Sequence, residues 1–387
     1  MPAKGAHVEG SYDAVVVGAG VIGAAVAWRL AGRGLSVALV DPAPGAGASR
    51  VAAGMLAPVT EVHYGEEPLL RLNLAAAERY PSFVAELREA GGDPAYRESG
   101  TLAVALDRGD RDALAEVRAF QRSLGLEVTE LSGRECRRLE PMLDPAVRGG
   151  TLVAGDHSVD PRRLHAALVA AGGRAGVQVV PRAVAEVRVV DGAVRGAVLD
   201  DGAHLAAPVV VVAAGSRSGL LPGLPGAARP DVRPVKGQVL RLRVPPAYRP
   251  LLSRTVRATV HGADVYLVPR EDGELVVGAT VEELGWDEQV TAGGVWQLLR
   301  DARALLPAVT ELAFVEASAG LRPGSRDNAP VIGPAGVEGL VVATGHYRNG
   351  ILLAPVTADA VAALVVDGAL PPVAAPFAPA AREGVPA

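Results

Sequence analysis

Three glycines near the start of the chain have the spacing of a pyrophosphate-binding turn. Gly18, Gly20 and Gly23 follow a short apolar run at residues 13–17 and precede an Ala- and Val-rich stretch. In a strand–turn–helix unit, the first glycine makes the tight turn, the second lets the backbone approach the phosphates, and the third allows close helix–strand packing. The first turn of the helix then directs its free N–H groups at the phosphates. The motif indicates a dinucleotide site and by itself does not separate FAD from NAD.

An acidic residue stands where the second strand of such a unit ends. Asp41 lies 23 residues beyond Gly18, at the end of the apolar run 35–40. A carboxylate at this point accepts hydrogen bonds from the ribose hydroxyls of an adenosine. Because the same charge would repel a 2′-phosphate, Asp41 disfavours NADP.

Two arginines and a tyrosine in the second half of the chain could bind a small carboxylate. Arg322 lies in the run 320–324, Arg348 in the run 344–350, and Tyr266 in an alternating apolar stretch. A guanidinium group pairs with a carboxylate through two parallel hydrogen bonds, a geometry that lysine does not reproduce. A tyrosine hydroxyl would add a third. Taken singly, each residue also suits an ordinary turn or sheet-edge position.

The elements that must position these residues alternate between buried strands and helices. Continuous apolar runs predict strands at residues 13–17, 35–40, 208–215 and 340–344. Helical spacing predicts helices at residues 21–30, 68–91, 163–171 and 351–364, and another that starts within residues 51–56. Asp-Gly pairs at 191–192 and 201–202 predict hairpin turns.

The order of these elements predicts an α/β fold with two domains. Longer, partly alternating runs at residues 232–244, 255–268 and 274–281 predict antiparallel strands of a different layer. We therefore expect a Rossmann-like cofactor domain built from discontinuous segments, with an inserted, mainly antiparallel substrate-binding domain. The expected segments are 11–90, 157–232 and 320–368 for the cofactor domain, and 91–156 and 233–319 for the substrate domain. Residues 1–10 and the Pro/Ala-rich stretch 369–387 are expected to be disordered.

Charge and composition argue against several classes of protein. A net charge of −5 offers no electrostatic attraction for nucleic acid or an anionic membrane. The first ten residues lack the apolar core of a secretory signal, and the longest uncharged run, residues 14–28, is shorter than the roughly 18 residues of a membrane span. The seven histidines show no metal-ligand spacing. One cysteine, Cys136, allows no internal disulfide. We expect a soluble, cytoplasmic protein without a metal.

Four further motifs, read in order, make the chain resemble the D-amino-acid oxidase family of FAD-dependent oxidoreductases. They lie at residues 50–55, 265–270, 319–324 and 345–355, within a likeness that runs from about residue 12 to about residue 367. Within the family, the chain is most similar to the glycine-oxidising members of thiamine biosynthesis. The resemblance implies non-covalent FAD and a homotetramer. Cys136 lies far in the sequence from every flavin motif, which argues against covalent attachment through cysteine.

The resemblance also implies roles for individual residues. Tyr266, Arg322 and Arg348 are the expected catalytic residues, and with Met55 they are expected to bind the substrate. One departure from the family is Asp264, where some relatives carry histidine, and it bears on substrate selectivity. The residues expected to hold FAD are Gly18, Gly20, Val21, Ile22, Gly23, Asp41, Ser49, Arg50, Ala53, Gly54, Met55, Val184, Gly215, His346, Tyr347, Arg348, Asn349, Gly350, Ile351 and Leu352.

The implied reaction is the oxidation of glycine, and also of sarcosine and small D-amino acids, to the imine, with O2 reduced to H2O2. Hydride transfer from the substrate Cα to the flavin needs no side-chain base, because FAD supplies the redox chemistry. The imine would serve the thiazole ring of thiamine, with thiazole synthase as its acceptor. Two alternatives stay open: a D-amino-acid dehydrogenase that passes electrons to a quinone, and a flavin-bound subunit without catalysis.

Overall fold

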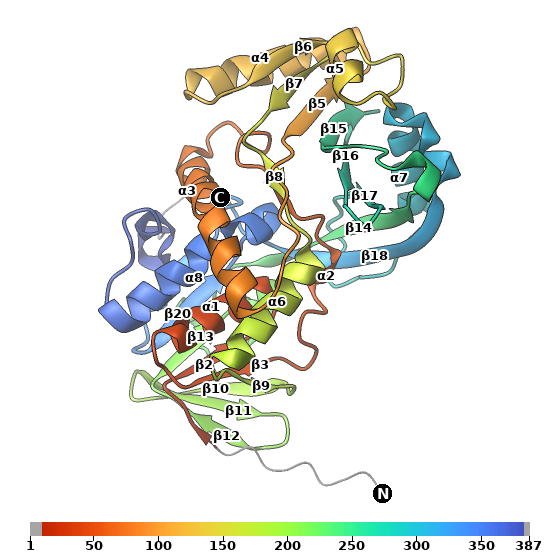
Figure 1. Ribbon diagram of the computed structural model, residues 1–387. Coiled ribbons are helices and arrows are strands. Elements are labelled where there is room, and N and C mark those ends of the chain that lie inside the picture. Colours follow the sequence, from red (N-terminus) through yellow and green to blue (C-terminus); the bar gives the residue numbers. More distant parts are fainter. Residues whose placement is uncertain (1–9, 383–387) are drawn as a thin grey trace, which may run out of the picture.

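The computed structural model describes residues 10–382, and its parallel sheet joins segments that are far apart in the sequence (Figure 1). The strand order is β19-β20-β13-β2-β3-β9, with parallel pairing throughout except between β19 and β20. Valine-rich runs without polar alternation suit strands that are covered on both faces. The strands are β2 (Ala14–Val17), β3 (Val37–Val40), β9 (Gln178–Val180), β13 (Val209–Val212), β19 (Val331–Pro334) and β20 (Leu340–Thr344).

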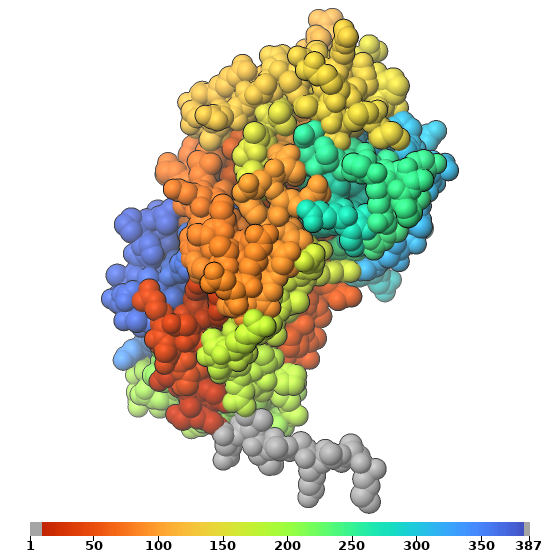
Figure 2. Space-filling model, in the orientation of Figure 1, coloured from red at the N-terminus to blue at the C-terminus, as the bar shows by residue number. Residues whose placement is uncertain are grey.

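Four helices cover one face of this sheet and form the largest apolar core with it. They are α1 (Val21–Gly32), α3 (Glu67–Ala90), α6 (Pro161–Arg174) and α8 (Gly350–Asp367). Helices α3 (orange) and α6 (yellow-green) lie side by side on the face shown in Figure 2. Within the described residues, the segment Tyr347–Asp367 has the length and apolar character of a membrane span, but 67% of its 18-residue apolar window is buried. Its packing against α1 and α3 accounts for that apolar character.

A smaller sheet covers the other face and buries a second apolar core against it. Its order is β1-β12-β11-β10, and its strands are β1 (Gly10–Ser11), β10 (Val184–Val190), β11 (Ala193–Leu199) and β12 (His204–Ala206). The turn between β10 and β11 is Asp191-Gly192, with φ of +52° and +77°. These positive values confirm the predicted hairpin turn, since Asp-Gly tolerates left-handed backbone there.

The second large sheet is mainly antiparallel and has eight strands, in the order β18-β14-β17-β16-β15-β5-β7-β6. Helices α4 (Arg108–Ser123), α5 (Gly133–Leu139) and α7 (Ala292–Leu305) accompany it (Figure 1). The strands are β5 (Thr101–Ala105), β6 (Thr129–Ser132), β7 (Gly149–Val153), β14 (Arg233–Arg243), β15 (Thr255–Val260), β16 (Ala263–Pro269), β17 (Glu274–Gly278) and β18 (Ala313–Gly324). A Rossmann-like sheet beside this second sheet confirms the predicted fold class.

Two predicted elements differ from the structure because of backbone at positive φ. The run 255–268 is a hairpin, since His261 and Gly262 turn the chain at φ of +52° and +79°. The helix predicted to start within residues 51–56 is wrong: α2 spans Ala48–Val51, and β4 (Met55–Leu56) pairs with β8 (His157–Ser158). Gly54 separates them at φ +78°, and a Cβ there would overlap the Val159 carbonyl oxygen.

The expectation of a disordered C-terminal tail is wrong for residues 369–382. Phe377 is buried against the helical face of the parallel sheet. Arg382 donates a hydrogen bond of 3.0 Å to the Ala329 carbonyl oxygen and pairs with Asp327. Composition did not indicate these two anchors. Gly10, the last residue of the expected N-terminal tail, begins strand β1, and the remaining parts of the expected tails, residues 1–9 and 383–387, lie outside the described residues.

Short 3-10 helices fill several of the connections. Their bounds are Gly215–Leu220 (η1), Gly226–Ala228 (η2), Pro246–Tyr248 (η3), Pro307–Glu311 (η4), Tyr347–Asn349 (η5), Ala375–Phe377 (η6) and Pro379–Arg382 (η7). The first and fifth are important for the site, since both follow strands of the parallel sheet and border the same cavity. Strand β18 also serves both regions, because it begins in the antiparallel sheet and ends beside that cavity.

Candidate functional site

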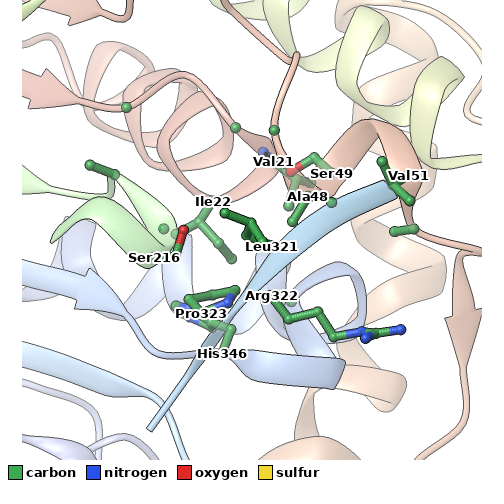
Figure 3. Close-up of a pocket in the computed structure, with 18 of the residues that line it drawn as sticks. Val21, Ile22, Ala48, Ser49, Val51, Ser216, Leu321, Arg322, Pro323 and His346 are labelled. Atoms are coloured by element: carbon green, nitrogen blue, oxygen red, sulfur yellow. Dashed lines mark hydrogen bonds between the residues drawn. The ribbon is translucent and has the colours of Figure 1, made fainter. Parts of the chain in front are cut away.

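One cavity of about 640 Å³ extends from the glycine turn after β2 to strand β18. Its size is in the usual range for a cofactor or ligand site. In Figure 3, the Arg322 side chain extends from β18 away from Ser216 and His346. Val21 and Ser49 lie across β18 from it in this view. Of the residues predicted to hold cofactor or substrate, those that line the cavity are Gly18, Gly20, Val21, Ile22, Asp41, Ser49, Ala53, Gly54, Met55, Val184, Gly215, Tyr266, Arg322, His346, Tyr347, Arg348, Gly350 and Ile351.

The glycine turn leaves no room for side chains. Gly18 has φ +102°, and a Cβ on it would lie 2.7 Å from the Ala213 carbonyl carbon. A Cβ on Gly23 would overlap the Gly18 carbonyl oxygen. The N-cap of α1 is Gly20, which has no side chain, and the Val21 N–H donates a hydrogen bond of 3.0 Å to the Ser49 hydroxyl oxygen at the start of the helix, which faces the cavity. This geometry suits a phosphate group.

Asp41 is fixed in the cavity wall by backbone amides. One carboxylate oxygen accepts a hydrogen bond of 2.7 Å from the Ala19 N–H, and the other accepts one of 2.8 Å from the Ala43 N–H. Carboxylate oxygens have further lone pairs to offer. Asp41 is therefore held in position to accept hydrogen bonds from ribose hydroxyls.

At the other end of the cavity, functional side chains lie over glycines of the antiparallel sheet. Tyr266 on β16 is opposite Gly278 on β17, and a Cβ on Gly278 would lie 2.5 Å from the Tyr266 Cε2 atom. A Cβ on Gly237 of β14 would likewise lie 2.5 Å from the Arg322 Cζ atom. Only glycine at these two positions lets the tyrosine ring and the guanidinium lie against the sheet.

Arg322 has no acidic partner within the described residues. Its Nη1 donates to the carbonyl oxygens of Thr280 at 3.2 Å and Lys236 at 3.4 Å, and the guanidinium pairs with no carboxylate of residues 10–382. Burial raises the pKa of Tyr266, and the neighbouring Arg322 offsets part of that rise. The tyrosine therefore stays a hydroxyl donor near neutral pH. Together the two side chains form a cationic, hydrogen-bonding site that suits a carboxylate.

The charge of Arg348, in contrast, is already compensated. Arg348 lies in η5, lines the cavity and pairs with Glu66. Glu66 also accepts a hydrogen bond of 2.9 Å from the Asn328 side chain. These contacts fix the segment that carries Arg348, and they distinguish it from Arg322 as a group for binding anions.

His346 contributes a neutral ring to the cavity wall. Burial lowers its pKa to about 3. One ring nitrogen, Nε2, lies 3.0 Å from the Thr357 hydroxyl oxygen. The side chain is therefore uncharged at physiological pH, so its contribution is shape and hydrogen bonding.

Arg270 holds the loop between α2 and β4 against the sheet. Its guanidinium donates 2.8 Å to the Val159 carbonyl oxygen and also donates to the Ala53 carbonyl oxygen. Burial lowers the pKa of Arg270 to about 10, so it remains cationic at neutral pH. The contacts fix Gly54 and Met55, which line the cavity.

Four predicted cofactor residues do not line the cavity. Gly23 lies beneath the turn against Gly18, and Asn349 and Leu352 are buried in the core around α8. The Arg50 carbonyl oxygen accepts a hydrogen bond of 3.1 Å from Arg162, and its exposed side chain lies outside the cavity. Sequence motifs indicate the segments that surround the cavity but do not say which side chains point away from it.

Sequence reasoning missed other residues that the structure brings to the cavity. The most informative are Glu61, Gly237 and Arg217. Only Gly237 carried a signal, as a glycine within a strand, which often marks a close approach. The single cysteine is not among the lining residues: Cys136 is buried, and burial raises the pKa of its thiol to about 11.

The fold and the cavity define a two-domain, dinucleotide-dependent oxidoreductase. The family model for FAD-dependent oxidoreductases named DAO matches residues 13–364, and the chain belongs to this family. It is 38% identical over 359 residues to a glycine oxidase of Geobacillus kaustophilus, covering 92% of this chain and 93% of that protein. It is also 34% identical to a bifunctional protein ThiO/ThiG of Synechocystis, covering 95% of this chain and 53% of that longer protein. The crystal structure of the Geobacillus kaustophilus glycine oxidase matches with a TM-score of 0.85 and 36% identity, covering 95% of this chain and 98% of that one.

The cavity fits the FAD that this family binds. The glycine turn is a cradle that a Cβ at Gly18 would fill, the start of α1 at the cavity wall suits a pyrophosphate, and Asp41 suits a ribose. The far end has a neutral histidine and the loop of Gly54 and Met55. Membership of the family and these features make the protein an FAD-dependent enzyme.

Proposed function

We propose that this enzyme oxidises glycine, and with it sarcosine and small D-amino acids, to the imine, and that O2 is reduced to H2O2. The observation that carries the proposal is the guanidinium of Arg322 beside Tyr266, which pairs with no carboxylate of residues 10–382 and lies in the cavity that fits FAD. A small amino acid offers its carboxylate as the one constant group for such a pair. The relatives named glycine oxidase support glycine as the substrate.

Each residue of the proposed site has a definable task. Arg322 binds the substrate carboxylate through its guanidinium, and Tyr266, kept protonated by burial, donates a third hydrogen bond. Arg348, fixed by Glu66, and Met55 close the cavity around the substrate. The parallel-sheet domain holds the cofactor through the glycine turn and Asp41, and FAD supplies the two-electron oxidation when bound. Binding and orientation are the tasks left to this chain.

We further propose a place in thiamine biosynthesis, with the imine consumed in formation of the thiazole ring. Support comes from relatives whose name joins ThiO to ThiG in one bifunctional protein, of which this chain spans about half. Thiazole synthase is the proposed acceptor of the imine. A homotetramer in the cytoplasm completes the proposal, and sedimentation analysis of the FAD-loaded protein tests the oligomeric part.

The test of the proposed reaction is peroxide release by the FAD-loaded protein. We expect H2O2 with glycine, sarcosine and D-alanine, and none with glycolate or L-leucine. A fully yellow preparation that oxidises none of the amino acids would overturn the proposal. The relatives favour neither a quinone-linked dehydrogenase nor a non-catalytic subunit, and peroxide formation in the absence of a quinone excludes both.

A further inference from the structure

A carboxylate that the sequence motifs did not indicate lies beside the proposed carboxylate-binding pair. Glu61 follows β4 and lines the same cavity as Tyr266 and Arg322. Its Oε1 atom accepts a hydrogen bond of 2.9 Å from Arg257. Its Oε2 atom has no hydrogen-bond partner in the part of the chain that the structure describes. One carboxylate oxygen is therefore anchored and the other is available.

The register of the sheet places this pair next to Tyr266. Arg257 on β15 is directly opposite Tyr266 on β16. Residues directly opposite each other in an antiparallel pair point to the same face, with Cβ atoms about 4.5–5.5 Å apart. Arg257 therefore brings Glu61 to the cavity face of the sheet, one strand beyond Tyr266 and on the side away from Gly278.

The residues before Glu61 are held firmly. The buried Asp156 accepts hydrogen bonds from the Val59 N–H at 3.1 Å, the Thr60 N–H at 2.9 Å and the Thr60 hydroxyl at 2.6 Å. Gln121 of α4 donates 3.0 Å to the Val59 carbonyl oxygen. Because both partners come from other elements, Glu61 sits at a fixed point of the cavity wall.

An amino acid presents two polar groups, and the cavity must satisfy both when water leaves it. The arginines beside Tyr266 are hydrogen-bond donors, namely Arg257 on the neighbouring strand and Arg322. The other two carboxylates of the lining do not serve this purpose. Asp41 is held by backbone amides at the glycine turn, and Glu288 is exposed. Glu61 is the half-buried acceptor beside the substrate-binding pair.

We propose that Glu61 binds the amino group of the substrate and determines specificity for amino acids. Its free Oε2 accepts a hydrogen bond from the substrate nitrogen, while Arg257 holds Oε1 and Arg322 binds the carboxylate at the other end. A simple carboxylate such as acetate has no group to donate to Glu61. The inference rests on the proposed function, because it concerns the same substrate in the same cavity.

The experiment compares glycine with acetate in the wild-type protein and in Glu61→Gln, both loaded with FAD. We expect the KM for glycine to rise at least tenfold in Glu61→Gln. The inhibition constant of acetate should stay equal or fall, because removing a nearby negative charge does not weaken the binding of an anion. The matched control is Glu86→Gln, which alters a carboxylate paired with Arg29 and Arg79 outside the cavity, and it should change neither constant.

Three results would overturn the inference. An unchanged KM for glycine means that Glu61 does not bind the amino group. If the inhibition constant of acetate rises together with the KM for glycine, or if the variant no longer retains FAD, Glu61 only supports the structure. Titrating the flavin absorbance band with glycine in the absence of oxygen, and separately with acetate, compares the binding of the two ligands to wild type and to Glu61→Gln directly. If the wild-type protein oxidises no amino acid, the proposed function fails. If it oxidises glycine and Glu61→Gln leaves the KM for glycine unchanged, only this inference is refuted.

Discussion

Adding one methyl group at Gly237 should weaken substrate binding although Arg322 itself is not replaced. A Cβ at this position would lie 2.5 Å from the Arg322 Cζ atom, whereas van der Waals contact begins at about 3.4 Å. The guanidinium must then move by about 1 Å or more. Gly237 in β14 does not have a positive φ, so the backbone at this position accepts alanine. Gly237→Ala therefore tests the placement of Arg322 rather than its presence.

The expected magnitude follows from the hydrogen bonds at stake. A hydrogen bond to a charged group contributes about 1.5–3 kcal/mol when it is properly made. Misplacing the guanidinium should therefore lower kcat/KM for glycine by about 10- to 150-fold, because each 1.36 kcal/mol is a factor of ten. The assay is steady-state peroxide release, with the flavin absorbance as the measure of cofactor content. The matched control is Gly293→Ala in α7, where a Cβ meets nothing within 4 Å, and it should behave as wild type.

A double-mutant cycle decides whether the effect acts through Arg322. Replacing Arg322 by Ala removes the carboxylate partner and should cost about 2–5 kcal/mol. If Gly237→Ala works by displacing that side chain, it should add almost nothing in the Arg322→Ala background. Additive losses, or a Gly237→Ala enzyme with unchanged kcat/KM, would refute the reasoning.

Three further predictions concern the cofactor turn and a buried acid. Gly23→Ala should abolish FAD retention, because its Cβ would overlap the Gly18 carbonyl oxygen, and a yellow, fully loaded variant by absorbance would contradict this. Asp41→Ala should weaken FAD binding by about 1–3 kcal/mol, measured by flavin fluorescence titration, since the carboxylate partner of Ala19, Ala43 and the ribose is lost; an unchanged Kd would count against the assignment. Burial raises the pKa of Asp156 to about 6, above its unfolded value of about 3.9, so its contribution to stability is present below about pH 4 and lost as pH rises through about 6. The unfolding free energy of wild type minus that of Asp156→Asn should accordingly fall by up to about 3 kcal/mol between pH 4 and pH 7, and a difference independent of pH would refute the shift.

Local chemistry explains which parts of the fold could be predicted from sequence. The glycine turn, the acid at the end of β3 and the Asp191-Gly192 hairpin each depend on a few adjacent residues whose backbone needs are specific. The helix predicted within residues 51–56 failed for a non-local reason. Gly54 has φ +78°, and the Val159 carbonyl oxygen, which comes from a distant part of the chain, leaves no room for a Cβ there.

The same distinction applies to the site. Arg322 and Tyr266 could be named from motifs, but the two glycines beneath them belong to other strands, and only the sheet register brings them together. Glu61 belongs to no motif, and its proximity to Tyr266 depends on Arg257 across a strand pair. The ordered C-terminal segment depends on Phe377 and on the pairing of Arg382, which composition does not reveal.

The two arginines of the cavity show why charge balance, and not residue type, assigns a role. By residue type alone, Arg322 and Arg348 could each hold an anion. In the structure Glu66 pairs with Arg348, whereas Arg322 donates to carbonyl oxygens and pairs with no carboxylate within the described chain. A partly buried cation that lacks an anionic partner is stabilised more by an incoming anion than a cation that is already paired. An incoming carboxylate therefore gains more at Arg322, and substitution of Glu66 by Gln should weaken the positioning of Arg348 while leaving the affinity for acetate largely unchanged.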